Sequence, residues 1–166
     1  LKENLGYYID LYNTWSSYGV ESEGVLVAFA SIHGNTRKAA EKIASILEKQ
    51  GAKKVVVSDL SRDDEAEVIE DAFRYGRMII AAPTYDGGLF PPMESFLSHL
   101  KSKNYQKRTV GIIENGTWAP MSGKLMKAAL ESMKEIKICD TVVTIKSALK
   151  AEQEDSLVAL AKEVLA

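Results

Sequence analysis

The chain of 166 residues has little of what defines several large protein classes. Its single cysteine, Cys139, excludes an internal disulfide framework and metal knuckles built from cysteine pairs. No apolar run approaches the roughly 20 residues that span a bilayer, and no charged-then-apolar signal segment opens the chain. The formal net charge of −2, without a basic stripe interleaved with aromatic residues, gives no reason to expect nucleic acid. We therefore expect a cytoplasmic protein without a membrane or nucleic-acid partner.

What the chain does have, from residue 25 onward, is an alternation of short apolar runs with amphipathic segments. The apolar runs are rich in Val and Ile and cover residues 25–30, 53–58, 77–82, 109–114 and 136–145. The amphipathic segments have apolar residues at helical spacing and cover residues 36–50, 63–75, 92–103, 121–134 and 152–165. Five strands buried on both faces, alternating with five helices, predict a parallel, doubly wound α/β sheet.

Residues 1–23 do not follow this pattern. Their apolar side chains fall on one face of a helix, at Leu1, Leu5, Tyr8, Ile9, Tyr12 and Trp15. This helix either packs on the domain or is a linker whose apolar face meets a neighbouring domain. Because the chain opens without an initiator Met, we expect a piece of a longer protein, with a linker at 1–23 and one domain at 24–166.

In a doubly wound sheet, ligands bind outside the carboxyl ends of the strands, at the switch point of the strand order. The loop after the first strand reads Ser31, Ile32, His33, Gly34, Asn35 and Thr36, and it leads directly into a helix. A helix start offers unpaired N–H groups and a partial positive charge, to which the two hydroxyls add donors. Gly34 lets the backbone approach a ligand closely. This loop predicts a phosphate site made of neutral donors.

The loops after the third and fourth strands suggest a flat aromatic ligand. The first of them contains Pro83, Thr84, Tyr85, Asp86, Gly87 and Gly88, and the other contains Asn115, Gly116, Thr117 and Trp118. We expect Pro83 to end its strand and Pro92 to begin the next helix. The structural alternatives are a glycine turn with a surface tyrosine, and a Trp118 folded back onto the domain. Taken with the phosphate loop, the ligand has the outline of flavin mononucleotide (FMN).

On these motifs, the chain from about residue 24 to its end resembles the flavodoxin-like family. The segment from Thr84 to Pro92, together with Asn115 to Trp118, is most similar to the C-terminal FMN-binding domain of A-type flavoproteins, the flavodiiron proteins. The resemblance implies a five-stranded sheet of order 2-1-3-4-5 with helices on both faces. It also implies that residues 31–36 bind the FMN phosphate, whereas residues 83–88 and 115–118 flank the isoalloxazine ring.

The function implied by this resemblance is electron transfer in a flavodiiron oxygen or nitric oxide reductase. Electrons would come from rubredoxin or a similar protein, from a reduced deazaflavin or from a nicotinamide. They would pass to a diiron centre on a metallo-β-lactamase-like domain. With only His33 and His99, this chain cannot build that centre, so we expect no metal ligand and no catalytic residue in it. The alternative is an FMN-dependent NAD(P)H:quinone-type oxidoreductase of the same fold, and both are compatible with a homo-oligomer.

Overall fold

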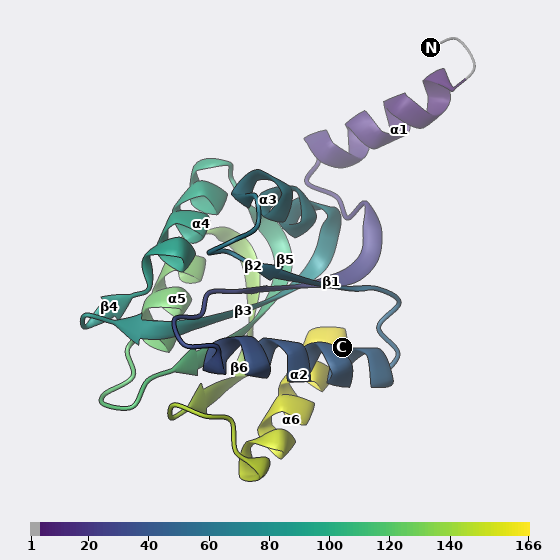
Figure 1. Cartoon of the computed structure of the whole chain (residues 1–166). Coiled ribbons are helices and arrows are strands. Elements are labelled where there is room, and N and C mark those ends of the chain that lie inside the picture. The colour runs from purple at the N-terminus through teal and green to yellow at the C-terminus, as the bar shows by residue number, and fades with distance from the viewer. Residues whose placement is uncertain (1–3) are drawn as a thin grey trace.

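The computed structural model describes residues 4–166 and shows a parallel sheet between two layers of helices (Figure 1). The strands of the sheet are β1 (Ser22–Phe29), β2 (Val55–Asp59), β3 (Tyr75–Tyr85), β5 (Gln106–Asn115) and β6 (Lys134–Ile145). They lie in the order β2-β1-β3-β5-β6, and each pairs with its neighbours in parallel. The predicted fold class and strand order are therefore confirmed. A two-residue strand, β4 (Gly88–Leu89), pairs antiparallel with β3 and was not predicted.

Helices cover both faces of the sheet (Figure 1). One face carries α2 (Asn35–Lys49) and α6 (Glu154–Leu165). The short 3₁₀ helix η1 (Ala151–Gln153) precedes α6. The other face carries α3 (Glu65–Arg74), α4 (Pro91–Ser102) and α5 (Ser122–Glu131). Successive residues of a strand point to opposite faces, so Leu26 packs under the second layer while Val27 packs under the first. Burial on both faces explains why the strands read as continuous apolar runs.

Two predicted boundaries at prolines are wrong. β3 does not end at Pro83 but continues to Tyr85, and α4 begins at Pro91 rather than Pro92. β1 ends at Phe29, opposite Ala81, so β3 has lost one of its two neighbours before it reaches Pro83. A residue without an N–H is tolerated in a strand where a neighbour is missing.

The N-terminal helix α1 (Leu5–Ser16) projects away from the sheet (Figure 1). None of its residues is buried, and its apolar side chains Leu5, Tyr8, Ile9 and Tyr12 are 50–68% exposed. The helix therefore does not pack on the domain, which was one of the two interpretations of this segment. Leu1, assigned to the same apolar face, lies outside the described residues. No helix within residues 4–166 is long and apolar enough to cross a membrane.

Candidate functional site

The loops that follow β1, β3 and β5 meet at the carboxyl edge of the sheet, around a cavity of about 240 Å³. It is lined by Ser31, Ile32, His33, Asn35, Thr36, Pro83, Thr84, Asn115, Gly116, Thr117 and Ser147. The three loops singled out in the sequence thus surround one cavity. Its polar lining groups are hydroxyl, amide, imidazole and backbone groups, its apolar ones are Ile32 and Pro83, and it contains no carboxylate side chain.

The first loop leaves the start of α2 open to the cavity. Gly34 stands at the N-cap position with φ +86°, a conformation that glycine adopts without strain, and it donates its N–H to Ser31 Oγ at 3.0 Å. No side chain caps the helix, so its first N–H groups are free to bind a ligand. Thr36 is buried, whereas the nearby cation Arg37 pairs with Asp59 and lies over the Phe29 ring. The hydroxyl and backbone N–H donors of this loop carry no charge.

The second loop is a β-hairpin between β3 and β4. Asp86 and Gly87 have φ of +49° and +71°, and a type I′ turn requires positive φ at both central residues. The turn pairs Tyr85 with Gly88, and the Tyr85 ring, which is half-exposed, lies 5.6 Å from the Phe90 ring. The hairpin therefore presents a flat aromatic side chain at the carboxyl edge. The dipeptide Asp-Gly between apolar residues is the sequence signal for such a turn.

The start of α5 is held by two side chains from neighbouring strands. Thr84 Oγ1 accepts hydrogen bonds from the backbone N–H groups of Met121 and Ser122, at 2.9 and 3.1 Å. Glu114 accepts one from Gly123 at 2.9 Å and another from the Thr144 hydroxyl at 2.7 Å. The Glu114 carboxylate is thus engaged by α5 and β6. Thr84, which lines the cavity, keeps its hydroxyl proton to donate to a ligand.

In the third loop, the side chain of Asn115 connects three segments of the site. Its amide nitrogen donates to Thr36 Oγ1 at 3.3 Å and to the Ser147 carbonyl at 3.0 Å, while its oxygen accepts from the Ser147 N–H at 3.0 Å. Trp118 is 89% exposed, so it does not fold back onto the domain. Gly116 packs closely, since a Cβ there would lie 3.0 Å from Pro120 Cα.

Ser147 lines the cavity but was missed in the sequence. It follows β6, which lies beside β5, and it adopts a positive φ of +70°. The predicted strand order places the ends of the fourth and fifth strands next to each other, so the same rule that selected the other loops could have found it. Within residues 4–166, no group of three or more His, Cys, Asp or Glu side chains could hold a metal ion.

Comparison with known proteins gives a family and several relatives. The family model "Flavodoxin domain" matches residues 26–153. Among curated proteins, coenzyme F420H(2) oxidase from Methanothermobacter marburgensis is 30% identical over 99 residues, which are 60% of this chain and 24% of that protein. The chain therefore spans only about a quarter of this relative.

Two solved structures resemble the chain to different extents. The flavodiiron protein from Giardia intestinalis matches 98% of this chain and 41% of its own, with a TM-score of 0.87 and 18% identity. The oxidised flavodoxin 1 from Bacillus cereus matches 86% of this chain and 97% of its own, with a TM-score of 0.73 and 18% identity. At such identities the likeness shows a shared fold.

Proposed function

Because the chain belongs to the flavodoxin domain family, we propose that it is an FMN-binding electron-transfer domain of a longer, flavodiiron-type oxidoreductase. The observation that carries this proposal is the cavity at the carboxyl edge of the sheet, where an uncapped helix start meets neutral donors and no carboxylate. A phosphate dianion binds well at such a place, because the helix end supplies N–H donors and partial positive charge.

The residues present fit both ends of FMN. The phosphate would be held by Ser31, Ile32, His33, Gly34, Asn35 and Thr36, whose loop has an open backbone at Gly34. The isoalloxazine ring would lie between the second loop (Pro83, Thr84, Tyr85, Asp86, Gly87, Gly88) and the third loop (Asn115, Gly116, Thr117, Trp118). Tyr85 and Trp118 offer exposed flat rings, which bind a planar ligand through offset stacking.

When bound, FMN supplies the electron-transfer chemistry, while the protein binds and orients it and controls access to it. The hydrogen bonds of Asn115 hold the phosphate loop and the third loop together. Those of Thr84 hold the start of α5, which follows the third loop. The exposure of Trp118 leaves this edge of the domain accessible to a redox partner. No catalytic residue of the chain is required for this role.

The comparisons favour the flavodiiron assignment over a free-standing flavodoxin. The flavodiiron protein matches 98% of the chain and the flavodoxin 86%, so the difference of 12% amounts to about 20 of 166 residues. That is close to the length of segment 1–23, which carries α1. We propose that this segment is a linker, and that the exposed apolar face of α1 contacts a preceding metallo-β-lactamase-like domain with a diiron centre.

The donor and the final acceptor follow from this proposal. The name of the curated relative favours reduced coenzyme F420 as the donor over rubredoxin or a nicotinamide. The acceptor would be oxygen or nitric oxide, reduced at the diiron centre. The parent protein would then be an oxidoreductase, whereas this domain would relay electrons.

The visible spectrum of the purified chain tests the proposal. After addition of FMN and desalting, we expect flavin absorption bands to remain with the protein at one FMN per chain. The flavin-loaded chain should not turn over NAD(P)H with a quinone. A colourless chain would contradict the FMN assignment, and sustained quinone reduction would favour the NAD(P)H:quinone-type oxidoreductase instead.

A further inference from the structure

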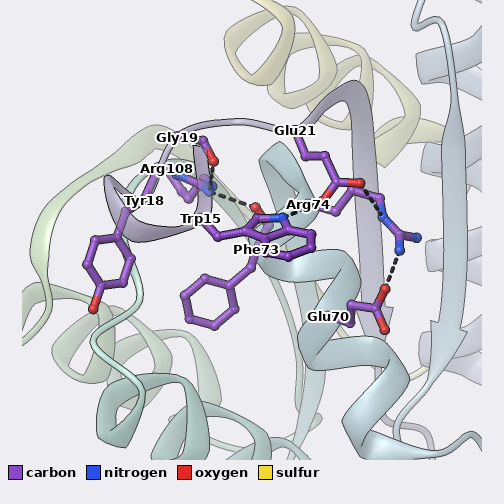
Figure 2. Close-up of a pocket in the computed structure, with 8 residues that line it drawn as sticks. All are labelled: Trp15, Tyr18, Gly19, Glu21, Glu70, Phe73, Arg74 and Arg108. Atoms are coloured by element: carbon purple, nitrogen blue, oxygen red, sulfur yellow. Dashed lines mark hydrogen bonds and ion pairs between the residues drawn. The ribbon is translucent and has the colours of Figure 1, made fainter. Parts of the chain in front are cut away.

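At the end of the sheet opposite the proposed flavin site, a buried arginine holds the segment that joins α1 to the domain (Figure 2). Arg108 lies near the start of β5 and is 3% exposed. Its guanidinium donates to six backbone carbonyls: Tyr18, Gly19, Phe73, Tyr75, Gln106 and Lys107. The six belong to the turn after α1, the end of α3, the start of β3 and the start of β5.

The two shortest of these hydrogen bonds are made to the turn after α1 and to the end of α3. Arg108 lies 2.7 Å from the Tyr18 carbonyl and 3.1 Å from that of Gly19, both just beyond the end of α1. It lies 2.6 Å from the Phe73 carbonyl, in the last turn of α3. A cation is favourable at a helix C-terminus, where the carbonyls carry partial negative charge. The guanidinium therefore links the turn after α1 to the C-terminal end of α3.

The dipoles of these carbonyls stabilise the positive charge of Arg108, because the neighbouring carboxylates pair with another residue. Glu21, Glu70 and Asp71 all pair with Arg74, as Figure 2 shows for the first two. Burial lowers the pKa of the Arg108 guanidinium, yet arginine stays protonated in proteins. Replacing Arg108 would remove this donor from the buried Tyr75 carbonyl and from five part-buried carbonyls, which costs free energy wherever no other donor takes its place.

The orientation of α1 depends on the turn that follows it, since the body of the helix has no buried residue. Its last turn is closed by the Gly19 N–H, which donates to the Thr14 carbonyl at 2.7 Å. A second, exposed contact is the Trp15 indole N–H, which donates to Glu21 at 2.8 Å. Between these groups and Phe73 lies a cavity of about 400 Å³, so side-chain packing fills this junction only in part.

We propose that Arg108 is a positioning residue that sets the direction in which α1 leaves the flavodoxin domain. If the proposed function is right, this direction also sets how the flavin site is presented to the preceding domain. Without Arg108, α1 would pivot about the loosely packed junction. Residues 8 to 16 of α1 extend about 12 Å at 1.5 Å per residue, so a tilt of about 20° would displace Tyr8 by about 4 Å.

A distance measurement between two spin labels tests the proposal without any flavin. Labels are attached at Tyr8→Cys on α1 and Glu48→Cys on α2, both exposed, in a Cys139→Ala background. With Arg108 present we expect one narrow distance distribution. In Arg108→Met the distribution should broaden and shift by several ångströms, and Arg108→Lys should fall in between because an ammonium has three donors instead of five.

A neighbouring arginine provides the matched control. Arg77 lies on β3 next to β5, opposite Thr109, and within residues 4–166 its side chain donates a single hydrogen bond, of 3.4 Å, to the Leu165 carbonyl. Arg77→Met should leave the distance distribution unchanged. If Arg108→Met does not fold, Arg108→Lys decides, and an unchanged distribution in a folded Arg108 variant overturns the proposal. FMN binding by the same proteins is a separate readout: failure of the unsubstituted chain to bind FMN would refute the proposed function but not the role of Arg108.

Discussion

Replacement of Asn115 by alanine should lower both the stability of the domain without flavin and its affinity for FMN. The substitution removes three hydrogen bonds, one with the buried Thr36 hydroxyl and two with the Ser147 backbone. At about 1 kcal/mol for each bond, and somewhat more for partners left buried and unsatisfied, the free energy of unfolding should fall by about 2–4 kcal/mol. For a domain of this size that corresponds to a drop in Tm of about 5–15 °C.

Asn115→Asp separates the structural effect from the electrostatic one. The carboxylate keeps an acceptor for the Ser147 N–H but adds a negative charge to a cavity that has no other carboxylate. Repulsion of the FMN phosphate by about 1–2 kcal/mol would weaken FMN binding about tenfold, whereas riboflavin, which lacks the phosphate, should be affected less. Asn104→Asp makes the same change at an exposed position just before β5 and serves as the control.

Urea unfolding of the apo chain gives the stability change, and quenching of flavin fluorescence gives the two affinities. The reasoning would be refuted if Asn115→Ala lowered the free energy of unfolding by less than about 0.5 kcal/mol, which is the range of ordinary surface substitutions. It would equally be refuted by an Asn115→Asp variant that binds FMN as tightly as the original chain.

Three further predictions concern single side chains. Tyr105→Phe should raise the free energy of unfolding by about 1 kcal/mol in urea, because the buried Tyr105 hydroxyl has no hydrogen-bond partner among the described residues. Trp118→Ala should change apo stability by less than about 0.5 kcal/mol yet weaken FMN binding in a fluorescence titration; unchanged binding would remove Trp118 from the site. Hydrogen bonds from Thr141 lower the pKa of Glu163, so its stabilisation is present above the ordinary value of 4.5 and is lost as pH falls through the lowered pKa. Urea unfolding on both sides of that pH should therefore show a smaller acid-induced loss in Glu163→Gln than in the original chain.

The fold was predictable because its strands are buried on both faces. Runs such as residues 25–30 and 77–82 are uniformly apolar in their middles, and their alternation with amphipathic segments predicts a parallel sheet. The hairpin at Asp86 and Gly87 was missed because β4 has two residues, too few for any apolar periodicity. Its only signal is turn chemistry, and the segment was interpreted as a ligand-binding loop, with a glycine turn as the alternative.

The cavity was predictable in outline but its internal connections were not. The switch-point rule places loops 31–36, 83–88 and 115–118 at one edge, and the structure brings residues of all three to one cavity. The network of Asn115 and Ser147, and four of the six carbonyl contacts of Arg108, join segments far apart in the sequence. No local pattern marks such contacts, because backbone carbonyls are present at every residue.

A paired titration of the apo chain with FMN and riboflavin tests the central claim most directly. If residues 31–36 bind the phosphate, FMN should bind at one per chain and much more tightly than riboflavin. Inorganic phosphate should then weaken the binding of FMN but not that of riboflavin. Equal affinities for the two flavins would contradict the phosphate site at the start of α2, and no binding of either would contradict the flavin assignment itself.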